Sequence, residues 1–486
     1  MKHNSVVLGA ILILSAGSVL YVLSGLPLGI PSEWAWRRFP NPSVSSELNF
    51  PIAPMLLILA LAGLARPEEL KGAALALLLA ALAVLSLSMH LAMSYLSPAG
   101  LDDSLPAVII PRANAYFQRA RKIGDLGDYL ARYEDEQRRP GVQVQLSTHP
   151  PGTVLFFYGW IRLCSTGPVK ALVDGTVKRL THSGAEFGTR ELDIFERDLA
   201  PAEKSGAWGA ALALKGLAAL AVLPLFLAAR RLGGQRLAFW ASLFYILSPG
   251  LYLFSPLMDQ FFPLLAAMAL WGASTEKPWG AAVAGLALFV GLLFSLVFLV
   301  VGGLMGLYWL LSLQARGLTR RLVPLGLTAI GVIALATLFV EVAGVDILGI
   351  WKLCYQKNGE FNAATGRSYL GWLILNPLDY LLAAGPVGAV LLAISLVTVA
   401  ARGRGGSPRT AALVLSLTIT LLALDLTGVN RGEVARLWLP FVPMTCACIP
   451  DEMFERRLLA MSLLAIAFAN SLVLKSTIDA LSLYSS

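Results

Sequence analysis

Residues 147–158 have the sequence Ser147-Thr148-His149-Pro150-Pro151-Gly152-Thr153-Val154-Leu155-Phe156-Phe157-Tyr158. A residue before proline is disfavoured in helical geometry, so His149 is expected to be extended. Pro151 suits the first turn of a helix, which predicts a helix from Gly152 to Cys164. The first amides of a helix have no partners within it and attract anions such as phosphate. The motif therefore predicts a histidine beside an anion-binding helix end.

This motif lies in a polar segment of a chain that is otherwise strongly apolar. Of the 486 residues, 57% are hydrophobic and 14% are charged, and the mean hydropathy is +0.69. Repeated apolar runs of about 20 residues are long enough to cross a bilayer as helices. The sequence therefore predicts an all-α, polytopic membrane protein. Basic cytoplasmic loops account for the formal charge of +8 better than nucleic-acid binding does.

The apolar runs predict about thirteen transmembrane helices, at residues 5–25, 51–65, 72–96, 207–229, 237–256, 260–275, 279–295, 296–313, 322–342, 380–402, 410–427, 437–450 and 457–477. No small-residue cleavage site follows the first run, so it is expected to remain as a span. Short basic loops alternate with long loops, and the positive-inside rule places the short ones in the cytoplasm. The long loops, and with thirteen spans the C-terminus, then lie outside.

Five segments follow from this pattern: an N-terminal three-span segment (1–96), an extracytoplasmic loop (97–206), central spans (207–342), a second extracytoplasmic loop (343–379) and C-terminal spans (380–486). The first loop contains 14 lysines and arginines and 14 acidic residues, so it is neutral overall. Its apolar pattern predicts two short interfacial helices, near 111–123 and 128–136, before the juxtamembrane helix 152–164. Residues 165–206 are expected to form a polar connector.

Asp102 and Asp103 form an acidic pair just beyond a predicted span. A carboxylate at the membrane surface can deprotonate a hydroxyl or contribute oxygen ligands to a divalent cation such as Mg²⁺ or Mn²⁺. The alternative interpretation is a helix cap or a solvated turn. Glu33, beside Trp34 and Trp36, is a second candidate carboxylate, although an interfacial aromatic belt explains the tryptophans equally well. The scattered cysteines and histidines predict no metal-ligand framework.

Two other charged residues lie inside or between spans. Lys215 lies ~12 Å along the helix from the outer end of its predicted span. A charge inside the bilayer is costly and marks a site or a paired position, unless the side chain snorkels to the interface. Asp259 lies in a short outer turn, Ser255–Gln260, where it contacts substrate or caps the next helix.

The second extracytoplasmic loop places cations beside aromatic residues, among them Arg367 and Tyr369. Guanidinium groups suit phosphates and aromatic faces suit sugar rings, so a sugar-phosphate ligand is one interpretation. The other interpretation is that these residues contact lipid headgroups.

A last polar patch, Arg431, Glu433 and Arg436, precedes the predicted span at 437–450. Glu433 and Arg436 are three residues apart and share one helical face. They form either a structural ion pair or a site where Arg436 neutralises a lipid phosphate.

Together these features resemble the GT-C superfamily of integral-membrane glycosyltransferases, which includes the protein O-mannosyltransferases and the aminoarabinose transferases (family 39 type). The resemblance covers about residues 97–273, and its motifs follow in order: Asp102-Asp103, then His149-Pro150-Pro151-Gly152, similar to the family's HPPL or KPPL, then Ala-Arg-Arg-Leu-Gly-Gly at 229–234, and Ser-Pro-Leu-Met-Asp at 255–259. In the family the acidic motif usually follows the first span. Here two more spans precede Asp102, so either they are an N-terminal addition, which we favour, or Glu33 is the family's acidic residue.

The resemblance implies inverting transfer of a sugar from a polyprenyl-phosphate donor to a hydroxyl of a lipid, glycan or protein acceptor. It implies Asp102 or Asp103 as general base or metal ligand, with Lys215, Arg367 or Arg436 stabilising the phosphate that leaves. The other residues expected to bind substrate are His149, Asp259, Tyr369, Arg431 and Glu433.

The location expected is the inner membrane of a prokaryote, with the active site on the extracytoplasmic side. A transporter or flippase for a lipid-linked or anionic solute is the alternative, because charges within spans also suit one. An oligosaccharide polymerase or ligase is a third interpretation.

Overall fold

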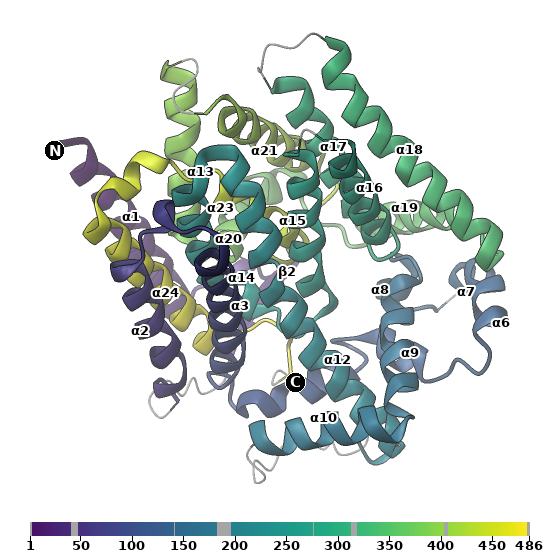
Figure 1. Ribbon diagram of the computed structural model, residues 1–486. Helices are drawn as coiled ribbons and strands as arrows, with labels where there is room; N and C mark the ends of the chain where they lie inside the picture. The colour runs from purple at the N-terminus through teal and green to yellow at the C-terminus, as the bar shows by residue number, and fades with distance from the viewer. Residues whose placement is uncertain are drawn as a thin grey trace.

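A computed structural model describes residues 2–39, 47–139, 141–181, 196–275, 277–312, 318–402 and 407–483, and nearly all of its elements are helices. Figure 1 shows a bundle of long helices with shorter helices gathered toward its lower end. The first half comprises α1 (Lys2–Leu23), β1 (Leu28–Ile30), β2 (Trp34–Arg38), α2 (Asn49–Leu64), η1 (Pro67–Glu69), α3 (Gly72–Ser94), η2 (Gly100–Asp103), α4 (Ser104–Ile109), α5 (Ala115–Ala120), α6 (Leu126–Ala131), α7 (Tyr133–Arg138), α8 (Val144–Ser147), α9 (Gly152–Cys164), α10 (Gly167–Leu180) and α12 (Pro201–Leu220).

The second half comprises α13 (Val222–Ile246), α14 (Gly250–Leu253), η3 (Met258–Phe261), α15 (Phe262–Ala273), α16 (Pro278–Leu292), α17 (Val297–Leu311), α18 (Leu318–Ala343), α19 (Ile347–Ala364), α20 (Tyr369–Arg402), α21 (Pro408–Thr427), α22 (Val434–Leu437), η4 (Leu439–Phe441), α23 (Val442–Ala447), η5 (Asp451–Glu455), α24 (Arg457–Thr477) and β3 (Ile478–Asp479). The three short strands form one antiparallel sheet in the order β1-β2-β3. The sheet joins the segment after α1 to the segment after α24.

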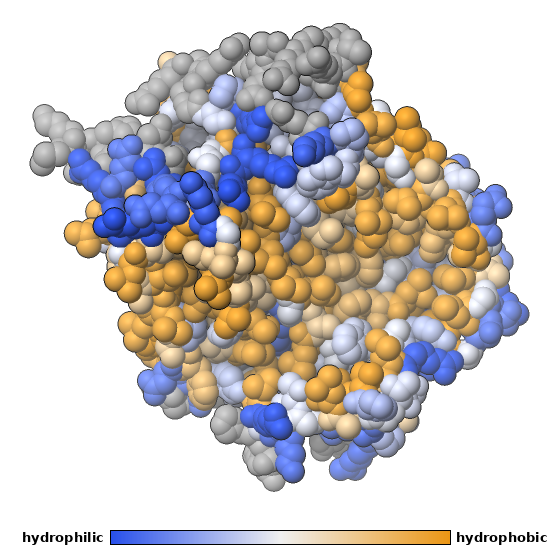
Figure 2. Space-filling view, viewed as in Figure 1, coloured by the Kyte–Doolittle hydropathy of each residue, from blue (hydrophilic) through white to orange (hydrophobic). Residues whose placement is uncertain are grey.

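The described residues include six helical segments that are long and apolar enough to cross a membrane: Gly72–Ser94, Pro201–Ile246, Leu322–Ala343, Tyr369–Ala401, Pro408–Thr427 and Arg457–Thr477. Figure 2 shows hydrophobic side chains in a broad belt across the visible face, between hydrophilic residues at the upper and lower ends. These features confirm that the described part of the chain is almost entirely helical, and the length and composition of the six segments indicate a membrane protein. The number of thirteen spans remains a prediction.

The chain reverses inside α13, where Gly234 has φ 92° and ψ −178°. Gly234 ends the Ala-Arg-Arg-Leu-Gly-Gly segment, which follows the predicted span 207–229 and precedes the predicted span 237–256. Glycine is suited to this conformation because a residue with a Cβ rarely adopts a positive φ. A similar break lies inside α20, at Gly385 with φ 77°.

Several of the short basic loops meet at one end of the bundle. The Gln235 amide donates to the backbone oxygens of Pro67 and Leu70, and Arg409 donates to the carbonyl of Arg231. Arg457 donates to the carbonyls of residues 63 and 65. These basic loops therefore lie at the same end of the bundle, as the positive-inside rule requires.

Several predicted segments differ in the structure. The second long loop, 343–379, contains α19 and the start of α20, and the predicted span 237–256 is interrupted after Ile246, before α14. Residues 437–450 do not form one continuous helix but the short helices η4 and α23, because Pro440 and Pro443 lack amide protons and interrupt helical hydrogen bonding. The expected polar connector 165–206 contains α10 and the start of α12. Its residues 182–195 lie outside the described part of the chain.

We expect the two ends of the bundle to lie on opposite sides of the membrane. The side chain of Arg66 at the basic end is 71% exposed, and that of Asp198, in the first long loop, is 79% exposed. An impermeant maleimide should label Asp198→Cys in intact cells and Arg66→Cys only after permeabilisation. The four native cysteines are free and buried, so they provide a low background. Labelling of both variants in intact cells would contradict this topology.

Candidate functional site

A cavity of about 850 Å³ lies among the long loops, and a volume of this size can hold a small-molecule ligand. Most of its walls come from the β1–β2 hairpin, the segment around α8, helix α19, and the loop between α21 and α22 with the start of α22, and the segment after β3 also contributes. The residues that matter for its chemistry are Glu33, Trp34, Trp36, Arg37, Arg112, His149, Asn358, Phe361, Asn362, Arg367, Arg431, Glu433 and Arg436.

The cavity is electropositive. Five arginines and two glutamates line it, which leaves an excess of three positive charges when His149 is neutral. Guanidinium groups bind phosphate through charge-assisted hydrogen bonds, and the tryptophan and phenylalanine rings offer flat apolar faces. This combination suits an anionic ligand that also has a ring, such as a sugar phosphate.

Glu433 holds two of these arginines together. Its Oε1 accepts a hydrogen bond from Arg367 Nη2 at 3.0 Å, and its Oε2 accepts one from Arg436 Nη2 at 2.9 Å. Glu433 has φ 60°, a left-handed conformation that is rare for residues other than glycine and is often found at functional sites. The backbone at Glu433 therefore places one carboxylate between two guanidinium groups.

Arg436 retains the capacity to bind an anion. Its Nε is buried and has no hydrogen-bond partner among the described residues, and only its Nη2 is used by Glu433. Burial alone would lower the pKa of Arg436, but the charges of Asp259 and Glu433 raise it. Arg436 therefore stays charged, and its Nε is a donor that no described residue uses.

Arg367 makes more contacts with the protein, although its Nε is also buried without a hydrogen-bond partner among the described residues. Its guanidinium lies 5.8 Å from the ring centroid of Trp34 and 5.6 Å from that of Phe361. It also donates to the carbonyl of Arg431 at 2.6 Å, while Arg431 donates to the carbonyl of Arg367 at 2.9 Å. Arg367 therefore shapes the wall, and its charge adds to the potential of the cavity.

Tyr369, predicted as a substrate-binding residue, supports this wall from behind. Its hydroxyl donates to the carbonyl of Leu426 at 2.7 Å, and its ring lies 5.9 Å from the guanidinium of Arg431. It is not among the residues that line the cavity.

Glu33 lines the same cavity from the turn between β1 and β2. Its Oε2 accepts hydrogen bonds from the Ser368 amide at 2.8 Å and from Trp372 Nε1 at 2.7 Å. Desolvation would raise the pKa of Glu33, but these hydrogen bonds and the charge of Arg367 hold it below its usual value. Glu33 is therefore an ionised carboxylate, and its Oε1 takes no part in these bonds.

His149 lines the opposite wall. Its Nδ1 lies 3.0 Å from the carbonyl oxygen of Gln145, an arrangement that favours a proton on Nδ1 and leaves Nε2 as an acceptor. Burial lowers the pKa of His149 to about 4, the charge of Arg436 acts in the same direction, and the hydrogen bond to Gln145 opposes both. The imidazole is therefore neutral at physiological pH.

Asp259 lies near Arg436 and Tyr116 without lining the cavity. Burial raises its pKa, against the lowering influence of Arg436. Asp259 thus adds a second acidic group behind the arginine.

The predicted anion site at the start of α9 is not formed. The Gly152 amide donates to the carbonyl of Leu293 at 2.8 Å, and residues 152–154 are buried. A Cβ on Gly152 would lie 2.3 Å from that carbonyl oxygen, so glycine is needed for this close approach. The Pro-Pro motif therefore serves to dock α9 against the end of α16.

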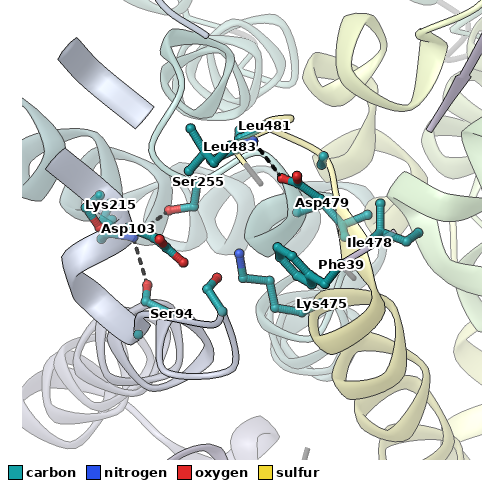
Figure 3. Close-up of a pocket in the computed structure, with 15 residues that line it drawn as sticks. Phe39, Ser94, Asp103, Lys215, Ser255, Lys475, Ile478, Asp479, Leu481 and Leu483 are labelled. Atoms are coloured by element: carbon teal, nitrogen blue, oxygen red, sulfur yellow. Dashed lines mark hydrogen bonds between the residues drawn. The ribbon is translucent and has the colours of Figure 1, made fainter. Parts of the chain in front are cut away.

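Asp103 and Lys215 lie in a second, separate site (Figure 3). Lys215 Nζ donates to Ser94 Oγ at 2.8 Å and to Ser255 Oγ at 2.9 Å. The charge of Asp103 acts on both Lys215 and Lys475. These side chains surround a void of about 10 Å³, roughly the size of one water molecule.

The second site and the large cavity share Ala480 and Leu481 as lining residues. The segment after β3 therefore separates the two. The predicted meeting of Asp103 and Lys215 with His149, Arg367 and Arg436 in one cavity does not occur. Asp102 lines neither site. The catalytic role of the acidic pair thus remains a prediction that this geometry does not favour.

The acidic pair does not fit a divalent cation. Asp103 lies beside two lysines, whose charges oppose a second cation, and Asp102 does not point into this void. The described residues also contain no group of three or more His, Cys, Asp and Glu side chains that could hold a metal ion.

Some of the site was not anticipated from the sequence. Arg37, Arg112 and Asn358 line the cavity, and Lys475 joins the second site. Lys475 had a usable signal, because it is a charge near the end of an apolar run. The other three belong to segments that were predicted to be polar loops, where nothing in the local sequence distinguishes them, although Arg37 lies in β2 and Asn358 in α19.

Comparison with known proteins identifies no relatives: no family model matches the chain, and no curated protein is significantly similar to it.

Removing the charge of Asp103 should destabilise the protein. Asp103 is 6% exposed. Asp103→Asn removes a negative charge that acts on the buried lysines Lys215 and Lys475. Breaking a buried ion pair from one side costs about 3–5 kcal/mol of unfolding free energy. Thermal unfolding in detergent should show a clearly lower Tm, whereas Asp102→Asn, which changes a more exposed carboxylate, should change it little. Equal Tm changes in the two variants would argue against a buried ionic cluster.

His149 should make stability depend on pH. Its pKa of about 4 in the folded protein lies below the ~6.5 of an unfolded chain, so the unfolded state binds more protons between these values. Folding stability should therefore fall as pH drops from 6.5 to 4, by up to about 3 kcal/mol. His149→Gln should remove this part of the decrease in a series of unfolding measurements. An unchanged pH profile in His149→Gln would show that the imidazole is not desolvated.

Proposed function

We propose that this protein transfers a sugar from a polyprenyl-phosphate donor to an acceptor hydroxyl in the large cavity. The proposal rests on one observation: three groups line the same electropositive cavity with aromatic walls. They are a neutral His149, an ionised Glu33, and Arg436, whose Nε has no hydrogen-bond partner among the described residues. The resemblance of the sequence to GT-C glycosyltransferases supports the same reaction class. We place the cavity on the extracytoplasmic side, because the basic loops lie at the other end of the bundle.

Glu33 is the carboxylate best placed to act as general base. Two of the described residues lining the cavity are carboxylates, Glu33 and Glu433. Both oxygens of Glu433 are bonded to arginines, whereas the hydrogen bonds that Glu33 accepts from the Ser368 amide and from Trp372 both use its Oε2. Glu33 Oε1 would take the proton of the acceptor hydroxyl as its oxygen attacks the anomeric carbon. This is the second of the two assignments that the sequence left open.

Arg436 would stabilise the departing phosphate. As the bond from the anomeric carbon to the phosphate oxygen breaks, its electron pair stays on that oxygen and negative charge accumulates there. A buried guanidinium with free donors lowers the energy of this charge more than an exposed one would. Trp34 and Trp36 offer the faces on which the sugar ring would stack.

The test is sugar transfer by purified protein in lipid, with radiolabelled polyprenyl-phosphate hexoses and several acceptors. Glu33→Gln keeps an oxygen that can accept from Ser368 and Trp372 but cannot take a proton, so transfer should fall about 100-fold or more while polyprenyl-phosphate binding persists. Arg436→Gln should instead weaken polyprenyl-phosphate binding. Asp102→Asn is the matched control outside the cavity, and it should keep its activity.

Three results would overturn this assignment. Loss of transfer in folded Asp102→Asn or Asp103→Asn, with Glu33→Gln active, would return the base to the acidic pair. Unchanged binding in Arg436→Gln would remove the phosphate site. Binding without turnover in every variant, wild type included, would favour a transporter of a lipid-linked or anionic solute.

A further inference from the structure

Asp379 joins the two walls of the cavity from behind. Its Oδ1 accepts a hydrogen bond from Trp36 Nε1 at 2.6 Å, and its Oδ2 accepts one from the Ala435 amide at 3.1 Å. Trp36 lies on β2, three residues after Glu33, and Ala435 directly precedes Arg436. One carboxylate on α20 thus holds both the strand next to the proposed base and the turn that carries the proposed phosphate ligand.

The other polar anchors on α20 each form hydrogen bonds to one wall only. Trp372 donates to Glu33 on the hairpin side. Asn376 accepts from the Gly432 amide at 3.1 Å and donates to the carbonyl of Asn430 at 2.9 Å on the loop side. Asp379 differs from both because its two oxygens bond to different walls.

The two bonds of Asp379 require a carboxylate. The side chain is 7% exposed, and both of its partners are N–H donors. An asparagine would turn an NH₂ group toward one of the two donors, leaving a buried N–H without an acceptor. Charge-assisted bonds are also stronger than neutral ones, so the carboxylate holds both walls firmly.

We propose that Asp379 is a positioning residue that fixes the separation between Glu33 and Arg436. It does not line the cavity and is not expected to touch substrate. Its effect on transfer rests on the proposed function, whereas its effect on the separation of the walls does not. A displacement of about 1 Å between reacting groups can cost about 100-fold in rate, so a small loosening of the walls should be measurable.

The separation of the walls can be measured without any activity. Ser32 is exposed beside Glu33, and Val429 is 38% exposed at the start of the opposite loop. Spin labels on Ser32→Cys and Val429→Cys report this distance by pulsed electron spin resonance, and the buried native cysteines leave the labelling specific. We expect a narrow distribution in this parent protein and a broader or shifted one after Asp379→Asn.

Two further variants make the test specific. Trp36→Phe removes one donor without changing a charge, so it should also broaden the distribution of spin-label distances. If Asp379→Asn does not fold, Trp36→Phe still tests the inference. The two changes together should have no more effect than Asp379→Asn alone, because either change already breaks the link between the two walls. Asp425→Asn is the matched control: Asp425 is also 7% exposed and accepts from Asn376, but among the described residues it has no hydrogen bond to the hairpin.

Transfer assays supply the second readout. Asp379→Asn should lower kcat at least tenfold, toward the 100-fold expected for a 1 Å displacement, and leave the donor KM within about twofold. Asp425→Asn should leave both constants near their parent values.

An unchanged distance distribution in folded Asp379→Asn, or equal broadening in Asp425→Asn, would overturn the inference. If wild type transfers no sugar, the proposed function fails, and the distance measurement still decides whether Asp379 positions the walls.

Discussion

The cavity depends on one constraint: guanidinium groups brought into the outer part of a helical bundle need a carboxylate between them. Taking an arginine out of water costs several kcal/mol unless a counter-charge and hydrogen bonds compensate. Glu433 meets this need for Arg367 and Arg436 together. The left-handed backbone at Glu433 and the close packing of Gly432 against Trp372 follow from placing that carboxylate in the turn. The excess positive charge that remains gives the cavity its preference for anions.

Helix α20 converts this local pairing into a rigid site. The residues at its start and along its first turns, Ser368, Trp372, Asn376 and Asp379, recur at helical spacing and contact either the hairpin or the loop. A site supported on a long packed helix keeps its geometry better than one supported by loops alone. The walls of the cavity come from segments more than 300 residues apart in sequence, and α20 gives them a common frame.

The protein separates two kinds of buried charge. In the cavity, arginines exceed carboxylates, and Arg436 keeps a donor without a partner. In the second site, Asp103 and Asp479 face Lys215 and Lys475, so the formal charges balance around a void too small for a substrate. Balanced charge inside a span is the arrangement expected of a structural network, because it limits the cost of burial. Unbalanced charge beside a large cavity is the arrangement expected of a binding site.

The sequence by itself determined the class of the protein. Apolar runs of membrane length specify helices, because a bilayer leaves the backbone no other partner than itself. The basic loops specified which loops lie together, and Arg431, Glu433 and Arg436 indicated one wall of the cavity from their spacing alone. Local chemistry of this kind needs no knowledge of distant segments.

Only the tertiary structure decided which carboxylate meets the arginines. The sequence alone favoured Asp102-Asp103 over Glu33, although each is an acidic group beside a span. The difference comes from contacts over more than 300 residues, Glu33 with Ser368 and Trp372, and Trp36 with Asp379. Helix packing likewise brings the first amide of α9 to the carbonyl of Leu293. Because that amide donates there, it is not available to the anion predicted to bind at Pro151. Charge and hydrogen-bonding capacity are properties of a residue, but the partner that uses them is chosen by packing.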